Sequence, residues 1–174
     1  MYNNKYFPVK RYRETLAFVK EHISDGSSIL DLGVENPFTT ILKKQGYQVI
    51  NTAGEDLDID TSEVKNNTAD VTTALQILEH MVSPMQVLQD VPSKKLIASV
   101  PLRLWFSKAY RNKSDQRDQH FHEFEDWQFD WLLEKAGWKI KAKKKWTNPV
   151  KKIGFRPILR LFTPRYYIIY AERD

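Results

Sequence analysis

The amino-acid sequence predicts an α/β domain of three layers, in which helices cover both faces of a mostly parallel sheet. Segments with apolar residues at helical spacing alternate along the chain with short apolar segments of strand length, as in parallel sheets. The chain has 174 residues, of which 41% are hydrophobic and 13% aromatic. This length and composition favour one folded domain with a core and exclude intrinsic disorder. No apolar run reaches about 18 residues, so no membrane-spanning helix is expected.

The first half of the chain predicts helices and strands in alternation. Tyr12, Leu16, Val19 and Ile23 recur at helical spacing and predict a first helix over 11–22, which Asp25-Gly26 ends. The following elements are a strand at 28–33, a helix at 38–45, a strand at 47–52, a weak third strand or a turn around 56–60, a strand at 69–74, and a helical stretch from 75 past Pro84 to about 89.

The second half of the chain predicts three more strands and one long helix. A buried strand is expected at 95–100, ended by Pro101. The helix is expected at 125–136, with Trp127, Trp131, Leu132 and Leu133 on one face, and Gly137 ends it. The last two strands are expected at 138–146 and 166–172.

The charge of the chain is unevenly distributed. The net charge is +5, and the segment 139–165 holds ten basic residues and no acid. Such a stretch attracts phosphates of nucleic acid or lipid, or forms the solvated face of a strand and loop. No aromatic-plus-glycine RNA-binding pattern accompanies it. We therefore expect weak attraction to anionic surfaces without specific nucleic-acid binding. Apolar residues among the bases of 149–164 could lie on a membrane surface or cap a substrate pocket.

The absence of cysteine excludes several classes of chemistry. Disulfide scaffolds, cysteine nucleophiles and thiolate metal sites are all ruled out. The first ten residues lack the pattern of a signal peptide, so a cytoplasmic location is expected. His120 and His122 share a face of an extended segment and, with a carboxylate, could hold a metal. No further ligand motif accompanies them, so we expect no metal site.

The end of the first predicted strand carries the most informative residues. In a parallel sheet, ligands bind beyond the carboxyl ends of the strands. Here Asp31-Leu32-Gly33 places an acid two residues before a glycine, which lets a backbone approach a ligand closely. After Gly33 the sequence continues with Val34 and Glu35, so the G-x-G-x-x-G pattern of dinucleotide-binding proteins is absent. This difference argues against an NAD-dependent oxidoreductase.

Several segments in order resemble a known family. They read Ile-Leu-Asp-Leu-Gly at 29–33, Ala-Asp-Val-Thr-Thr-Ala-Leu-Gln-Ile-Leu-Glu-His at 69–80, Ser-Val-Pro at 99–101, His-Phe-His-Glu-Phe at 120–124 and Ala-Gly-Trp at 136–138. Over 27–172 the chain resembles the class I S-adenosylmethionine-dependent methyltransferases, within them the type 11 and type 23 small-molecule groups. The resemblance implies a Rossmann-like three-layer sandwich with a seven-stranded, mostly parallel sheet whose last strand is antiparallel. It also implies one domain over 1–174, with an N-terminal helix (1–26), a cofactor-binding half (27–101) and a substrate-facing half (102–174).

The resemblance assigns cofactor contacts to residues at four strand ends. Glu35 stands where the family usually has a second glycine, and its carboxylate could reach the cofactor's ammonium group or crowd the pocket. The ribose acid is either absent or supplied by Glu55 or Asp56, and Asp58 or Asp60 resembles the acid beside the adenine. Each of these acids could equally belong to a solvated loop. The implied S-adenosylmethionine-binding residues are Asp31, Gly33, Val34, Glu35, Glu55, Asp56, Asp58, Leu75 and Gln76.

The resemblance also implies residues that face the reacting groups. Glu79-His80 matches a Glu-His pair of the family, and because neighbouring helical residues point about 100° apart, we expect the two not to share a role. His122, rather than His120, is expected to accept the acceptor's proton, with His80 as its competitor. A structural role for either histidine is the alternative. Arg103, Trp105 and His120 are the expected substrate contacts.

Two hypotheses for the function follow. The first is an S-adenosylmethionine-dependent methyltransferase that acts on a small-molecule or lipid-like acceptor. Positioning and removal of one proton are then the protein's main tasks. The second is a methyltransferase-like binding module that has lost cofactor binding and holds a partner through the basic stretch.

Overall fold

Six strands form one mixed sheet in the computed structural model, which describes residues 8–115, 118–150 and 153–174. The strand order across the sheet is β2-β1-β3-β4-β6-β5. The strands are β1 (Ser28–Asp31), β2 (Gln48–Asn51), β3 (Val71–Leu75), β4 (Lys95–Pro101), β5 (Lys139–Thr147) and β6 (Pro164–Glu172). The first four strands run parallel to one another, whereas β6 is antiparallel to both β4 and β5. The expected mixed α/β sheet is therefore confirmed.

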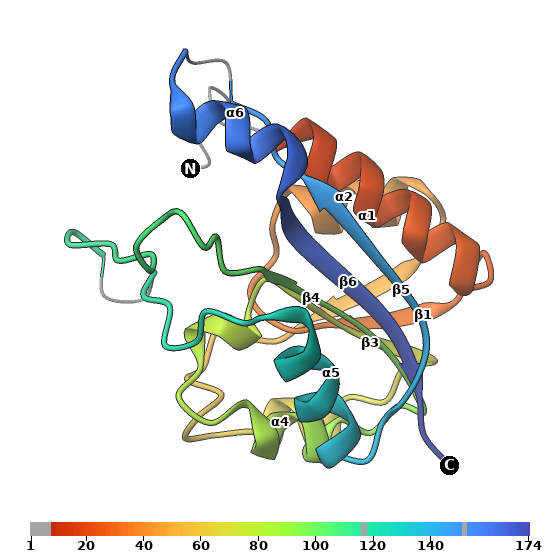
Figure 1. Ribbon diagram of the computed structural model, residues 1–174. Helices are drawn as coiled ribbons and strands as arrows, with labels where there is room; N and C mark the ends of the chain where they lie inside the picture. Colours follow the sequence, from red (N-terminus) through yellow and green to blue (C-terminus); the bar gives the residue numbers. More distant parts are fainter. Residues whose placement is uncertain (1–7, 116–117, 151–152) are drawn as a thin grey trace.

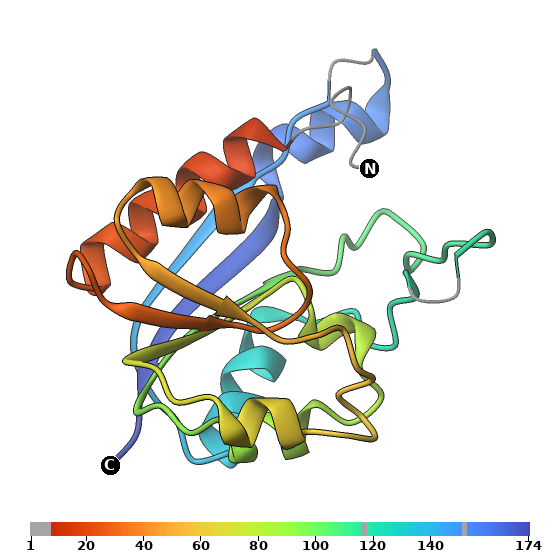
Figure 2. The same cartoon turned by 180° about the vertical axis from the view of Figure 1, so that it is seen from behind.

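Helices cover the two faces of this sheet (Figures 1 and 2). On one face, α1 (Val9–His22) and α2 (Pro37–Lys44) bury Phe18, Val19, Phe38 and Leu42 against the strands. On the other face lie α3 (Ser62–Asn66), α4 (Pro84–Asp90) and α5 (Asp126–Lys135). A last helix, α6 (Phe155–Phe162), projects beyond the sheet near the start of α1 (Figure 1). The helices of both faces thus enclose one core on each side of the sheet.

The sheet has six strands among the described residues, and not the seven that the resemblance implied. The segment around 56–60, where a weak third strand or a turn was expected, forms a turn. Aspartates at alternate positions stabilise it, because Asp56 accepts a hydrogen bond from the N–H of Asp58, and Asp60 accepts one from the N–H of Ser62. Short acidic side chains that bond nearby backbone in this way compete with strand pairing.

The helical stretch expected over 75–89 is interrupted. Leu75 ends β3, a single 3-10 turn (η2, Leu78–His80) follows, and α4 begins only at Pro84. Between the 3-10 turn and α4, the two carboxylate oxygens of Asp58 accept hydrogen bonds from the backbone N–H groups of Val82 and Ser83, at 2.7 Å each. Proline at the first helical position then starts a new helix, because its missing N–H costs nothing there.

The buried face of α5 differs from the expected one. Phe129 and Leu133 are fully buried, whereas Trp127 and Trp131 are more than half exposed. The two tryptophans obey the same helical spacing as the core residues but lie on the opposite side of the helix. Periodicity alone did not separate the two faces.

The lysines of the basic stretch are mostly neutralised. Each lysine of β5 forms an ion pair: Lys139 with Asp174, Lys141 with Glu172, Lys143 with Asp130, Lys144 with Glu14, and Lys145 with Asp126. The solvated-face interpretation therefore fits β5. Lys151 and Lys152 lie outside the described residues. Within the part of the chain that the structure describes, no helix is both long and apolar enough to cross a membrane.

Candidate functional site

Two adjoining cavities open at the edge of the sheet where the parallel strands end. The first, of about 170 Å³, lies between α1, the β1–α2 turn and the end of β3, and its lining includes Asp31 and Leu75. The second, of about 490 Å³, lies between the end of β3, the start of β6 and the segment that carries His120. Arg11 and Gln76 line both cavities. The arrangement provides two neighbouring compartments that share a wall.

Asp31 is a buried acid at the wall of the first cavity. Its carboxylate accepts hydrogen bonds from Thr73 at 2.6 Å, from Asn51 at 3.1 Å and from Thr39 at 3.3 Å. Burial raises the pKa of Asp31 to about 6, although these hydrogen bonds oppose the rise. The carboxylate therefore ties the ends of β1, β2 and β3 to α2, and so shapes the cavity.

The turn after β1 depends on Gly33. Gly33 has a φ of +102°, a conformation that side chains rarely adopt, and its N–H donates to the Thr52 hydroxyl at 2.8 Å. The neighbouring loop after β2 packs tightly on it, because a Cβ on Gly54 would come within 2.6 Å of the Val34 side chain. Val34 thus contacts the loop at 53–55 rather than the cavity.

Glu35 does not crowd the first cavity. Its side chain is 61% exposed and forms an ion pair with Lys43 of α2 at 3.0 Å. Asn36 then caps α2 by accepting N–H bonds from Phe38 and Thr39. Of the two roles considered for the carboxylate of Glu35, the structure shows neither, because the side chain lies along the surface of α2.

The three acids expected near the ribose and adenine differ in what they contact. Both carboxylate oxygens of Glu55 are inaccessible to solvent and have no hydrogen-bond partner. Asp56 is exposed and bonds within its own turn. Asp58 uses both oxygens on the Val82 and Ser83 amides, as described above. Glu55 is therefore the acid whose hydrogen-bonding capacity is left for a ligand.

Gln76 forms the wall between the two cavities. It is the one described residue other than glycine with a positive φ, +59°, a strained conformation that is often found at functional sites. Its N–H donates to the Ser99 carbonyl at 2.9 Å and its side-chain amide donates to the Ser99 hydroxyl at 3.2 Å. These bonds to β4 hold the strained residue in place.

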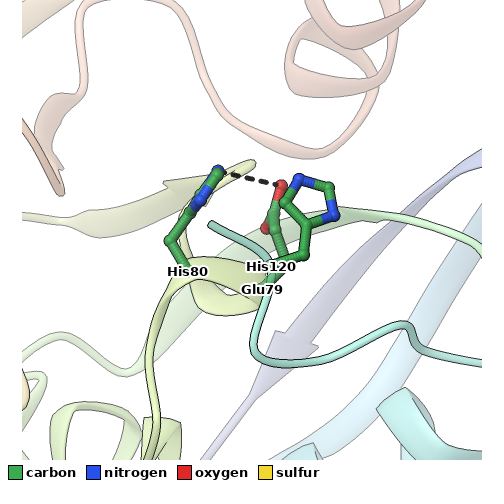
Figure 3. Close-up of side chains that lie close together, drawn as sticks. All are labelled: Glu79, His80 and His120. Carbon is green, nitrogen blue, oxygen red and sulfur yellow. Dashed lines mark ion pairs between the residues drawn. The ribbon is translucent and has the colours of Figure 1, made fainter. Parts of the chain in front are cut away.

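Glu79, His80 and His120 meet in the second cavity (Figure 3). Their ligand atoms lie within 4.8 Å of one another, and His80 Nε2 is 3.8 Å from Glu79 Oε1. Glu79 is 1% exposed and its Oε2 has no hydrogen-bond partner. Burial raises the pKa of Glu79 to about 8 and lowers the pKa of His80. Glu79 and His80 were expected to point apart, but they occupy a 3-10 turn and both line one cavity; whether they share a role stays a prediction.

The rest of the second cavity is polar and aromatic. Arg11 and Arg165 supply two guanidinium groups, and Arg165 Nη1 lies 3.8 Å from a Glu123 carboxylate oxygen. The Tyr110 hydroxyl donates to Asp118 at 2.6 Å. Both Tyr110 and Asp118 line the cavity. Such a cavity suits a ligand with polar or anionic groups on an aromatic or apolar frame.

The predicted reacting residues divide into two groups. His80 and His120 line the second cavity. His122 does not; its Nε2 is 3.1 Å from the Val82 carbonyl, and its ring stacks on Phe124. Arg103 is exposed and pairs with Glu125, and Trp105 is 68% exposed. Neither lines either of these two cavities, which therefore bring together only His80 and His120 of the five.

Several cavity residues were not among the predicted site residues, Arg11, Arg165 and Tyr166 among them. Arg11 lies on α1, and only the apolar face of that helix was used in the sequence analysis. Arg165 and Tyr166 begin β6, and because β6 is antiparallel to β4, its start lies at the edge where the parallel strands end. Because the last strand was expected to be antiparallel, the sequence could have predicted that its first residues lie at this edge. Tyr110 belongs to the segment 102–118, which was expected to face the substrate without a role for this residue, and it lines the second cavity.

Comparisons with known proteins bear on the fold. No protein-family model matches the chain, and no curated protein matches it in sequence. Solved structures do match. One is the 1,6-didemethyltoxoflavin-N1-methyltransferase of Burkholderia thailandensis, with 1,6-didemethyltoxoflavin and S-adenosylhomocysteine bound. It has a TM-score of 0.67 and 16% identity, over 98% of this chain and 82% of that one. A SAM-dependent methyltransferase of Archaeoglobus fulgidus matches with a TM-score of 0.59 and 15% identity, over 98% and 100%.

These likenesses show that the chain has the fold of the class I S-adenosylmethionine-dependent methyltransferases, as its motifs indicated. The narrower resemblance to the type 11 and type 23 groups stays a prediction. The same fold also supports other chemistry. The [4+2]-cyclase SpnF matches with a TM-score of 0.58 and 12% identity, over 94% of this chain and 81% of that one. The activity must therefore be argued from the cavities themselves.

Proposed function

We propose that this chain is an S-adenosylmethionine-dependent methyltransferase that acts on a small-molecule or lipid-like acceptor. The proposal rests on one observation above all: two cavities of different character share the wall formed by Gln76. One lies at the glycine turn after β1, and the other is lined by groups that exchange protons. A two-substrate transfer needs two such compartments in contact, because the reacting atoms must meet at about 3–3.5 Å.

The residues of the first compartment fit the cofactor. Gly33 carries no side chain at the end of β1, and its φ of +102° is one that other residues rarely adopt. Glu55, on the loop after β2, does not line the cavity, but its two buried oxygens without partners are suited to accept hydrogen bonds from two ribose hydroxyls. Asp31, Leu75 and Gln76 line the cavity itself. When bound, S-adenosylmethionine supplies a methyl group that is already activated on sulfur.

The second compartment would hold the acceptor and manage its proton. His80 Nδ1 is 2.8 Å from the Gln119 carbonyl, which fixes the proton on Nδ1 and leaves the Nε2 lone pair directed at Glu79. His120 Nδ1 is 3.2 Å from Glu123 Oε1, which orients its ring in the same manner. Two imidazole lone pairs therefore face the acceptor, able to accept its proton or to bind a cation. The proton-accepting role expected for His122 stays a prediction that this geometry does not favour.

The binding-module hypothesis makes the opposite prediction about the cofactor. It relied on Glu35 as an obstacle and on the missing ribose acid. Glu35 forms an ion pair with Lys43 on the surface of α2, and Glu55 offers two buried carboxylate oxygens without partners. The two hypotheses separate on whether the first compartment binds S-adenosylhomocysteine, the demethylated product.

Amide chemical shifts provide the test. In a ¹⁵N-labelled sample we expect S-adenosylhomocysteine to shift the resonances of Gly33, Gly54, Glu55 and Gln76. The resonance of Gly137, at the far end of α5, is the internal control. NAD at the same concentration should shift none of them. Shifts confined to other parts of the chain would reject the proposed cofactor site, and no shift at all would favour the binding module.

A further inference from the structure

The cluster of Glu79, His80 and His120 has the features of a metal site. Two imidazoles and one carboxylate are a donor set that divalent transition metals such as zinc bind, with a further position left open. Ligands of a tetrahedral zinc lie about 3.4 Å apart, given metal–ligand bonds of about 2.0–2.2 Å. The three ligand atoms here lie within 4.8 Å of one another, so small side-chain rotations suffice to close the site.

The surroundings of the two histidines match those of metal ligands. Ligating histidines usually donate their second N–H to a carbonyl or a carboxylate, which fixes the ring. His80 Nδ1 has the Gln119 carbonyl at 2.8 Å, and His120 Nδ1 has Glu123 Oε1 at 3.2 Å. Both rings thus offer Nε2 to the space beside Glu79, as Figure 3 shows. The two rings stand nearly perpendicular, with centroids 4.9 Å apart.

The third donor is a carboxyl group without a partner. Glu79 is 1% exposed, its Oε2 has no hydrogen-bond partner, and it lines the second cavity, called the acceptor cavity below because it would hold the acceptor. A buried oxygen without a partner is costly, and such groups in native proteins often indicate a missing ion or water. We propose that Glu79, His80 and His120 bind one divalent transition-metal ion in the wall of the acceptor cavity.

The open position of this metal faces the cavity. If the proposed methyltransferase function holds, an acceptor hydroxyl would bind there and release its proton to solvent water more easily, because a bound cation lowers the pKa of a ligating oxygen. With both Nε2 lone pairs on the metal, His80 and His120 would then act as ligands and not as the proton acceptors. The metal site then deepens the proposed function by favouring an oxygen acceptor. Metal binding itself does not depend on that function and can be tested without the cofactor.

Titration with Co²⁺ tests the site, because its visible absorption reports nitrogen and oxygen ligands directly. We expect one Co²⁺ per chain, displaced by Zn²⁺, with affinity lower in His80→Ala and His120→Ala by more than the about 10–100-fold that loss of a ligand's outer partner costs. His122→Ala is the matched control, since His122 lies outside the cavity, and it should bind Co²⁺ as the unchanged chain does. Glu79→Gln keeps the side-chain shape and should also weaken binding, which guards against misfolding of the alanine variants.

Two results would overturn the metal site. One is the absence of a Co²⁺ band at millimolar metal in a folded sample; the other is equal loss of binding in His122→Ala. Calorimetry with S-adenosylhomocysteine on the metal-free chain separates this failure from failure of the proposed function. Cofactor binding without metal binding rejects the metal site alone.

A second inference concerns α6 and rests on separate observations. No residue of α6 is buried, and Phe155, Ile158, Leu161 and Phe162 are each at least half exposed. At 3.6 residues per turn, these four and Leu159 occupy an arc of about 160°. Arg156 and Arg160 lie on the opposite side of the helix. Among the described residues, neither arginine forms an ion pair. A cationic amphipathic helix of this kind is typical of segments that lie in a membrane interface.

The position of α6 agrees with such a contact. It ends three residues before Arg165, which lines the acceptor cavity, and it projects beyond the sheet (Figure 1). We infer that α6 binds the surface of an anionic lipid bilayer, with its apolar arc in the interface and its arginines beside the headgroups. The surface would then lie next to the mouth of the acceptor cavity.

Vesicle co-sedimentation tests this contact. We expect binding to vesicles of phosphatidylcholine with phosphatidylglycerol and about tenfold weaker binding to phosphatidylcholine alone. Replacing Phe155 and Phe162 by serine should abolish binding. Replacing the exposed Trp127 and Trp131 of α5 by serine is the matched control and should not. Undiminished binding in the α6 variant, or a dimer that only this variant loses, would overturn the inference.

Discussion

Replacing Gly33 by alanine separates the backbone cost of the β1–α2 turn from its role in ligand binding. Gly33 has a φ of +102°, and a Cβ there would meet only Ile77 Cδ1, at 3.5 Å, which is an ordinary contact. The cost of Gly33→Ala therefore comes from backbone conformation, about 1–2 kcal/mol. For a chain of this size, that lowers the melting temperature by about 2–8 °C.

Gly137 provides a matched control. It has a φ of +94°, and a Cβ there would meet no atom within 4 Å. Gly137→Ala should therefore lose a similar amount of stability, but it lies after α5, away from both cavities. Any difference between the two variants in ligand binding then reflects the position of Gly33 rather than general destabilisation.

Thermal unfolding with and without S-adenosylhomocysteine measures that difference. A ligand at 100 times its Kd stabilises the folded state by about 2.7 kcal/mol, which corresponds to roughly 5–10 °C here. We expect Gly137→Ala to keep this shift and Gly33→Ala to lose most of it, because the added methyl group occupies space at the ligand's approach. An equal ligand-induced shift in both variants would refute the role given to Gly33.

Three further predictions concern stability. Burial raises the pKa of Asp31 from 3.8 to about 6. The folded chain therefore retains a proton that the unfolded chain releases. The Asp31 contribution to stability should fall by about 3 kcal/mol as pH rises from about 4 to 6, and urea titrations should show that Asp31→Asn removes this slope. Asp58→Ala loses two backbone N–H partners and should cost about 1–3 kcal/mol in urea unfolding; Asp56→Ala loses one exposed bond and should cost clearly less. Phe129→Ala should cost about 3–5 kcal/mol, whereas Trp131→Ala on the exposed face should cost under about 1 kcal/mol by the same assay; comparable costs would contradict the observed face of α5.

The order of elements and the functional edge of the sheet were accessible from the sequence. Apolar spacing predicted α1, α2 and α5 to within a few residues, and Asp31 and Gly33 predicted a ligand site at the end of β1. The predictions for the three helices held because they depend on local pattern, whereas the ligand site, which rests on the general property of parallel sheets that their carboxyl ends form one edge, stays a prediction.

The predictions that differed from the structure depend on contacts between distant segments. Asp58 was assigned to the cofactor, but its oxygens bond amides at Val82 and Ser83, more than twenty residues away. His122 follows His120 by two residues, yet only His120 turns into the cavity, because the backbone N–H groups of Phe121 and His122 bond the Glu79 carbonyl and fix that segment. Spacing along the chain contains no information about such contacts.

Calorimetric titration of the unchanged chain with S-adenosylhomocysteine tests the central claim most directly. We expect saturable heat of binding for one site per chain and no heat with NAD. The expected Kd is about 10 to 100 µM, equivalent to roughly 5.5–7 kcal/mol of binding free energy. Absence of heat at millimolar S-adenosylhomocysteine, in a sample shown to be folded, would contradict it.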